Sequence, residues 1–306
     1  MTSSESTAHP GNASAIKSSG PTIGLGIATR DRWEDLAETL RQLEAFGSGA
    51  LAKIIIIDDG STSPCPPEIV ARYPRIEFLR DEKSRGYIAQ RNRLAQLLDT
   101  DYYLSLDDDS CPVSGSFEGL VDFLQAHPEI CSLAFHLFRG ADAPAGGPNE
   151  EPRRVKAFIG CGHLQQLARF RELGGYREEL AFYNEEEELS IRIWKKGWSI
   201  VYYPGLVIRH RANPAQAHRN TARRAYYFAR GRMLLTLWNV PGRQLPLRLL
   251  AASWFSYRFS SRNNLLPTVS GALRGLWDGF RLWRYRDPLS APVYSEFRNA
   301  VWPPVA

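Results

Sequence analysis

Two short apolar runs in this chain lead directly into carboxylates, and no other feature constrains the fold as strongly. Lys53–Asp58 contains four consecutive isoleucines and is followed by Asp59, while Tyr102–Leu106 leads into the three aspartates Asp107–Asp109. Continuous apolar, β-branched runs of this length are typical of parallel strands that are covered on both faces. In open α/β sheets, ligands bind beyond the carboxyl ends of the strands, so these acids are candidates for a ligand or cation site.

Strand-like and helical segments alternate along the first half of the chain. Apolar residues at helical spacing predict helices, and short β-branched runs predict strands. The flanking elements are strand Ile23–Thr29, helix Trp33–Phe46, strand Ile76–Arg80 and a helix from Gly86 to Leu98. This alternation predicts an α/β fold with a mainly parallel, doubly wound sheet. A dinucleotide-binding fold is not supported, because no GxGxxG follows the first strand.

Two polar residues stand where helix N-caps are expected. Asp31 precedes the first helix, and Asn184 precedes a later helix that opens with four glutamates. Short polar side chains at such positions accept hydrogen bonds from the first turn, so we expect both residues to cap their helices.

The four glutamates, Glu185 to Glu188, open that later helix. The helix dipole favours acids in a first turn, which explains most of them without any catalytic role. Helical phase separates them, because Glu186, and to a lesser extent Glu185, falls on the face marked by Leu189. A carboxylate that points inward is costly unless it has a partner or a function, so Glu186 is the candidate for a chemical role.

Charge is distributed unevenly along the chain. The net charge is +5, but residues 189–306 hold 19 Lys and Arg against three acids, a net of +16, which leaves −11 for residues 1–188. In this basic segment Arg274, Trp277, Arg281 and Arg284 recur at helical spacing. Basic and aromatic residues together suit an anionic membrane surface. The alternative is a helical cap whose aromatic residues pack on the core or on a second subunit.

The remaining composition bears on organisation and compartment. Residues 1–20 lack an apolar core and are expected to form a disordered tail rather than a signal peptide. No stretch approaches the roughly 18 apolar residues of a transmembrane helix. The four cysteines form no CxxC pair, which fits a reducing compartment. We therefore expect a tail at 1–20, a catalytic domain at 21–213 and a helical extension at 214–306, in the cytoplasm or peripherally on the inner face of the plasma membrane.

Taken in order, these motifs resemble those of family 2 glycosyltransferases of the GT-A fold, especially bacterial rhamnosyl- and galactofuranosyltransferases. The resemblance covers about residues 22–240. It rests on Ile57–Ser61, on Gly86 with Arg91-Asn92, on the DxD-like Leu106–Ser110, and on Gly174-Gly175-Tyr176 followed by Glu185-Glu186. Two positions differ from the usual pattern, since Ser84 stands where Asn is commoner and Glu186 where Asp is usual.

The resemblance implies a role for each matching residue. The residues implied to bind the nucleotide sugar are Thr29, Arg30, Asp59, Gly86, Arg91, Asp107 and Asp108. Binding of Mg²⁺ or Mn²⁺ falls to Asp109 and His210. Glu186 is the expected catalytic base, with Glu185 as the alternative.

The activity implied is inverting transfer of a sugar from a nucleotide-diphosphate sugar to a hydroxyl of a glycan or lipid-linked acceptor, in cell-surface polysaccharide synthesis. A sugar nucleotidyltransferase is the first alternative, but it should have a glycine-rich loop where this chain has Ala28–Asp31. A catalytically inactive basic binding module is the second. Nucleic acid is not an expected partner, and the choice between monomer and homo-oligomer stays open.

Overall fold

The computed structural model describes residues 20–139, 149–211, 221–260 and 264–305. The predicted disordered tail lies outside the described residues except for its last position. The predicted boundary between catalytic domain and extension, at residues 213 and 214, also lies outside them.

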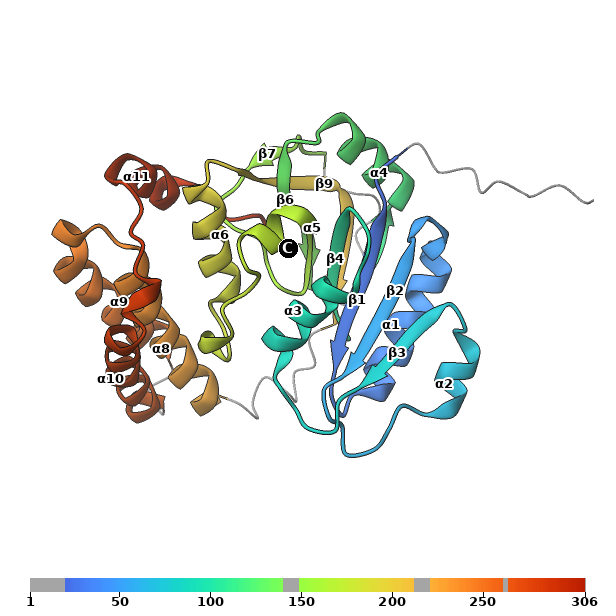
Figure 1. The fold of residues 1–306 in the computed structure, drawn as a ribbon, viewed down its shortest axis with the longest axis horizontal. Coiled ribbons are helices and arrows are strands. Elements are labelled where there is room, and N and C mark those ends of the chain that lie inside the picture. Colours follow the sequence, from blue (N-terminus) through green and yellow to red (C-terminus); the bar gives the residue numbers. More distant parts are fainter. Residues whose placement is uncertain (1–19, 140–148, 212–220, 261–263, 306) are drawn as a thin grey trace, which may run out of the picture.

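The described residues form one central sheet with helices on both faces (Figure 1). Its strands are β1 (Ile23–Thr29), β2 (Lys53–Asp58), β3 (Ile76–Arg80), β4 (Tyr102–Asp107), β5 (Ser110–Gly115), β6 (Ile130–Phe138), β7 (Arg153–Arg154), β8 (Gly162–Gln166) and β9 (Ser199–His210). The strand order is β3-β2-β1-β4-β8-β6-β9-β5, and β7 pairs with β9. The predicted strand positions in the first half are confirmed.

The sheet is mixed rather than parallel throughout. β1 to β4 pair in parallel, as the buried isoleucine run of β2 predicts. β8 is antiparallel to both β4 and β6, and β5 is antiparallel to β9. β6 and β9 again pair in parallel. The α/β fold class is thus confirmed, while the antiparallel pairs did not follow from the alternation of helices and strands.

Helices cover the sheet in two apolar layers. They are α1 (Trp33–Phe46), α2 (Pro67–Arg72), α3 (Tyr87–Leu97), α4 (Phe117–Ala126), α5 (Leu167–Glu172), α6 (Glu185–Lys195), α8 (Thr221–Asn239), α9 (Leu245–Phe259), α10 (Leu265–Arg281) and α11 (Ala291–Asn299). One layer contains the apolar side chains of α1 and α4. The other contains those of α3, α5, α6 and α8, so α6 reaches the cavity from the face opposite α1.

The two predicted N-caps are wrong. Asp31 adopts a positive φ of 54°, and its carboxylate accepts a hydrogen bond from Thr62 N instead of capping α1. Asn184 occupies the cap position of α6 with φ 69°, but its side-chain amide donates to Phe228 O. In both cases a tertiary partner has replaced the local one.

The basic C-terminal segment is helical, and its helices α9 and α10 pack on α8 at the end of the molecule remote from β3 (Figure 1). Glycines of α10 face α8, since a Cβ on Gly271 or Gly275 would lie 2.1 or 2.5 Å from a backbone carbonyl oxygen of α8. Most large apolar residues of α10 therefore point outward: Trp277 and Phe280 are 65% and 62% exposed, whereas Leu276 packs against the core. Trp277 and Phe280 do not pack on the core, whereas Trp238 and Phe297 of the same basic segment do, so the helical-cap alternative holds for part of the segment.

Candidate active site

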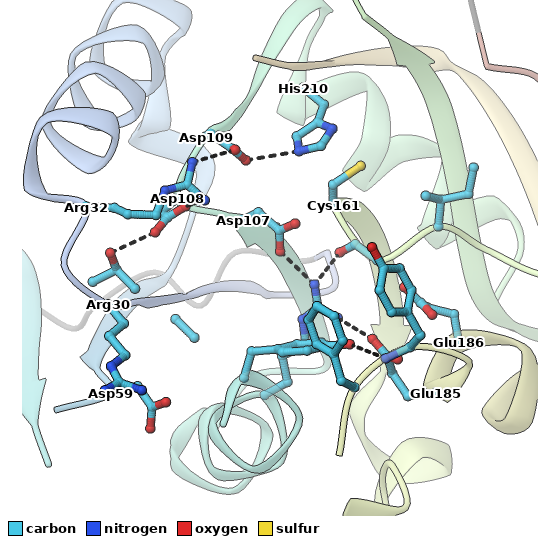
Figure 2. Close-up of a pocket in the computed structure, with 18 of the residues that line it drawn as sticks. Arg30, Arg32, Asp59, Asp107, Asp108, Asp109, Cys161, Glu185, Glu186 and His210 are labelled. Carbon is cyan, nitrogen blue, oxygen red and sulfur yellow. Dashed lines mark hydrogen bonds and ion pairs between the residues drawn. The ribbon is translucent and has the colours of Figure 1, made fainter. Parts of the chain in front are cut away.

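A cavity of about 660 Å³ opens beyond the carboxyl ends of β1, β2 and β4 (Figure 2). The predicted site residues on its wall are Thr29, Arg30, Asp59, Arg91, Asp107, Asp108, Asp109, Glu185, Glu186 and His210. Gly86 does not line it. The structure thus brings together residues that are as much as 181 positions apart in the sequence.

His210 reaches the aspartates because β5 and β9 pair antiparallel, with Ser110 opposite His210. Its Nε2 lies 3.1 Å from Asp109 Oδ1, and Figure 2 shows the two side chains pointing toward each other. Ligand atoms of Asp107, Asp109 and His210 all lie within 4.8 Å of one another. Asp109 Oδ1 is buried and faces His210 Nε2, so the two atoms are placed to act as neighbouring ligands of one cation. Two carboxylate oxygens and an imidazole nitrogen form a donor set that fits Mn²⁺ or Mg²⁺.

The charges around Asp109 favour its ionised form. Burial opposes ionisation, but the hydrogen bond with His210 and the guanidinium of Arg32 outweigh it and hold the pKa of Asp109 well below its usual range. Burial likewise acts to lower the pKa of His210, yet Asp109 raises it overall. Each group therefore stabilises the charge of the other.

Asp108 has a different environment from its two neighbours. Its carboxylate accepts a hydrogen bond from Thr29 Oγ1 at 2.8 Å and is only 4% exposed. Burial raises its pKa to about 7, with Arg32 opposing the shift. This hydrogen bond thus joins Thr29, at the end of β1, to Asp108, just after β4, at the base of the cavity.

Arg32 belongs to the site but was not predicted. Its guanidinium lies 3.0 Å from Asp108 Oδ1 and 2.6 Å from Asp109 Oδ2. Its position in the sequence could have indicated a place in the site, because Arg32 follows the carboxyl end of β1 by three residues. Arg30, which was predicted, lines the cavity but has a 55% exposed side chain beside Asp31. Arg139 and Arg224 also line the cavity and were missed, because neither belongs to a recognisable motif.

Asp59 and Gly86 both stabilise the loop that precedes α3. The Asp59 carboxylate accepts hydrogen bonds from Ser84 Oγ, Arg85 N, Gly86 N and Gln90 Nε2, at 2.6 to 3.0 Å. Gly86 has φ 88°, a left-handed backbone that favours glycine, and so presents its N–H to Asp59. Ser84, which stands where Asn is commoner, therefore still bonds to this aspartate. The loop that opens α3 is fixed beside the cavity.

Arg91 is the buried centre of the site. Its guanidinium donates to Asp107 Oδ1 at 2.6 Å, to Glu185 Oε1 at 3.2 Å and to Gly160 O at 3.0 Å. Three segments far apart in the sequence therefore share one cation. Arg91 lines the cavity, but most of its donors are used by the protein itself.

The burial of Glu185 and Glu186 is the reverse of what the sequence predicted. Glu185 is 1% exposed and paired with Arg91, whereas Glu186 is only partly covered, so the prediction that Glu186 is the more buried of the two is wrong. The reason is that Glu185, four residues before Leu189, occupies the face of α6 that packs against α3. Burial, and then the neighbouring charge of Glu185, raise the pKa of Glu186. Burial also raises the pKa of Glu185, against the effect of Arg91.

Residues 25–190, more than half of the chain, match the profile described as glycosyl transferase family 2. This chain belongs to glycosyltransferase family 2. An N-acetylglucosaminyl-diphospho-decaprenol L-rhamnosyltransferase of Mycobacterium tuberculosis is 26% identical, over 52% of this chain and 67% of the relative. The prediction of a glycosyltransferase is confirmed.

Solved structures of glycosyltransferases share the fold of this family 2 enzyme. S. aureus TarS in complex with UDP-GlcNAc aligns over 85% of this chain and 81% of its own, with TM-score 0.60 and 15% identity. The mannosyltransferase PcManGT of Pyrobaculum calidifontis, with GDP-Man and Mn²⁺, aligns over 86% and 83%, with TM-score 0.57 and 15% identity. GalNAc-T7 with UDP, GalNAc and Mn²⁺ aligns over 72% of this chain but only 49% of its own, with TM-score 0.58 and 18% identity. The GT-A fold predicted for this chain is therefore confirmed.

Proposed function

We propose that this glycosyltransferase is inverting and metal-dependent, and that it moves a sugar from a nucleotide-diphosphate sugar to an acceptor hydroxyl. One observation carries the proposal: the cluster of Asp107, Asp109 and His210 and the carboxylate of Glu186 lie on the wall of the same cavity. A divalent-cation site and a base for the acceptor are the two groups that such a transfer requires.

The donor half of the cavity is suited to a diphosphate. Asp109 and His210, with Asp107 as a third ligand, would hold Mg²⁺ or Mn²⁺, which supplies Lewis-acid stabilisation of the leaving diphosphate when bound. Arg139 and Arg224 add positive charge to the same wall. Asp59 fixes the loop beside the expected nucleoside position, and Thr29, Asp108 and Gly86 support the walls. The solved relatives with UDP-GlcNAc, GDP-Man and UDP are consistent with a nucleotide donor.

On the acceptor side, Glu186 is the proposed base. Its raised pKa makes it a stronger base than an ordinary carboxylate once it is ionised. It takes the proton of the acceptor hydroxyl, whose oxygen then forms a bond to the anomeric carbon. The bond between that carbon and the β-phosphate oxygen breaks, and the nucleoside diphosphate leaves. One displacement from the opposite face inverts the configuration. Glu185 is held by Arg91 and positions the start of α6.

The acceptor is proposed to be lipid-linked, in cell-surface polysaccharide synthesis. The relative from M. tuberculosis is a rhamnosyltransferase named for a diphospho-decaprenol acceptor. The outward face of α9 and α10 carries exposed Trp254, Leu273, Trp277 and Phe280, interspersed with arginines. Among the described helices none is long and apolar enough to cross a bilayer. We propose that this face rests on an anionic membrane surface, at the inner face of the plasma membrane, where it meets the acceptor.

Nucleotide binding is the first test of the donor proposal. A thermal-shift panel of nucleoside diphosphates should raise Tm with Mn²⁺ present and not with excess chelator, because ligand binding stabilises the folded state. Asp109→Asn should lose this metal-dependent rise while its circular dichroism spectrum stays that of the wild type. Full sugar transfer in excess chelator would contradict the metal requirement.

A further inference from the structure

A second cavity, of about 410 Å³, adjoins the first. The two share Ile159, Tyr183 and Glu186, so the proposed base lies where they meet. The second cavity extends from there toward α8, α9 and the C-terminal end of the described chain. Five of its residues are aromatic and lie outside the first cavity, namely Phe158, Phe228, Phe255, Phe259 and Trp302.

Two cations interrupt this apolar lining. Lys156 is half-buried, and its Nζ lies 4.6 Å from the ring centroid of Phe297 and 5.9 Å from that of Trp302. Burial lowers its pKa, and the charge of Glu187, which lines the same cavity, opposes this shift without forming an ion pair with Lys156 among the described residues. A partly buried ammonium that lies among rings and has no carboxylate in direct contact is stabilised when an anion reaches it.

The second cation is Arg232 of α8. One of its terminal nitrogens forms an ion pair with Glu187. Its Nε, in contrast, is buried and has no hydrogen-bond partner among the described residues. Because Nε itself is not exposed to the cavity, a phosphate oxygen would meet the terminal nitrogens of this guanidinium, which lines the same cavity as Lys156.

The apolar part of the cavity continues to the surface. Phe228 of α8 stacks on Phe259 with 3.9 Å between ring centroids, and Phe255 lies beside them. Phe255 and Phe259 are 52% and 47% exposed, so the wall that they form belongs both to the cavity and to the exposed face of α9. An apolar chain that leaves the cavity would follow these rings to that face.

We propose that the second cavity binds the acceptor as an anionic amphiphile, with its hydroxyl at Glu186, its phosphate at Lys156 and Arg232, and its apolar chain along Phe255 and Phe259. This inference rests on the proposed function, because it assumes that Glu186 activates the acceptor. It adds the chemical class of the acceptor and the residues that recognise it. The phosphate accounts for the two cations in an otherwise aromatic lining, and the chain accounts for the aromatic wall.

Calorimetric titration with geranyl phosphate tests this assignment, with the first cavity filled by Mn²⁺ and the nucleoside diphosphate found in the thermal-shift panel. Lys156→Gln should weaken binding of geranyl phosphate about tenfold or more, as expected for the loss of a charge-assisted hydrogen bond. Trp302→Ala, at a half-exposed position, should also weaken it. Lys53→Gln, on the far strand β2 beside Glu77, is the matched control and should bind as the wild type does. Nucleotide affinity should be unchanged in all three variants.

Further ligands distinguish a single-chain lipid phosphate from free phosphate and from bulk phospholipid. Geraniol and inorganic phosphate should each bind at least about tenfold more weakly than geranyl phosphate, because each lacks one of the two recognised parts. Dihexanoyl phosphatidylglycerol, which has two chains, should also bind weakly. Binding as tight as that of geranyl phosphate would mean that the cavity takes bulk lipid and would overturn the assignment. So would equal affinity in wild type and Lys156→Gln, or displacement of geranyl phosphate by the nucleotide. The titration is repeated without nucleotide, so that a failure of nucleotide binding, which contradicts the proposed function, can be told apart from a failure here.

Discussion

Glu185 and Glu186 are neighbours in the sequence with different surroundings, and this difference separates their proposed roles. Glu185 lines the first cavity but is only 1% exposed and is paired with Arg91, while Glu186 borders both cavities. A base must reach the proton that it removes, so access matters as much as pKa. Glu186 has the access.

Replacing Glu186 by Gln removes the proposed base at nearly constant size. We expect kcat to fall by roughly 10²–10⁴-fold with nucleotide affinity retained. Because a base works only when ionised and the pKa of Glu186 is raised, wild-type kcat should rise with pH through a limb above the ordinary carboxyl range. Steady-state kinetics across pH measure both. A large loss in Glu185→Gln together with a normal Glu186→Gln would assign the base to Glu185.

Gly160 sets the position of the Glu186 carboxylate. A Cβ at this residue would lie 2.3 Å from Glu186 Oε1, which is the free end of a flexible side chain. We therefore expect Gly160→Ala to fold normally, to push the carboxylate aside and to lower kcat at least about tenfold, since misplaced catalytic groups lose rate steeply. Kinetics and thermal unfolding check this together. An unchanged kcat would show that the carboxylate does not act from this position.

Which site residues the sequence could predict depends on how the backbone places them. Asp59 and Asp107 to Asp109 follow buried strands, so their shared edge could be predicted from periodicity alone. Arg32 could not, because its contacts depend on which way one long side chain turns. The caps Asp31 and Asn184 failed because local rules do not contain the tertiary partners Thr62 and Phe228.

Among the helices, α10 packs in the opposite way to an ordinary surface helix, whose large apolar residues face the protein interior. Its glycines at positions 271, 275 and 279 face α8, and most of its large apolar residues face away. Close approach of two helices requires small residues between them, and the bulk is then displaced to the other side. The exposed apolar face is therefore a consequence of how α10 packs.

Substituting Gly275 tests this packing. A Cβ there would lie 2.5 Å from Arg230 O, which is backbone and cannot move aside. Gly275→Ala should lower the free energy of unfolding, because an overpacking cost of about 1–3 kcal/mol exceeds the helix-propensity gain of about 1 kcal/mol. Chemical denaturation measures the change. Ser270→Ala, at an exposed position of the same helix, should stay within about 0.5 kcal/mol of wild type. An equally stable Gly275→Ala would contradict the close packing.

Individual elements were easier to predict than their pairing. The isoleucine run of β2 identifies a parallel strand because it is buried on both faces. β5 (Ser110–Gly115) has no such run and was not predicted, although its pairing with β9 is what carries His210 to Asp109. The direction of β8 likewise depends on its partners β4 and β6, which no local pattern encodes.

In the whole molecule, both cavities and the exposed apolar face form one continuous path. The first cavity meets the second at Glu186, and the second is bounded by α9, whose outer side is exposed. Figure 1 shows α9 and α10 together at one end of the molecule. A membrane at that end would present an amphiphilic acceptor directly to the second cavity.

Sedimentation with liposomes tests the membrane proposal. We expect the protein to pellet with anionic vesicles at low salt and less so at high salt, since each Lys or Arg near such a surface contributes about 1 kcal/mol. Trp277→Ala should weaken this binding, whereas Val70→Ala, an exposed apolar residue on α2, should not. Equal recovery in the supernatant under all conditions would rule out membrane binding, and a dimer by light scattering would then assign the face to a second copy.

The contacts of Arg91 restrict which substitutions the protein can accept during evolution. Arg91 pairs with the partly exposed Asp107 and with the fully buried Glu185, so a substitution at position 91 leaves Glu185 buried without its counter-charge. A buried carboxylate that loses its counter-charge is strongly destabilising, so a lineage cannot drift through such a change gradually. Positions 91 and 185 should therefore be inherited as a pair, and any descendant that replaces one of them should also have replaced the other.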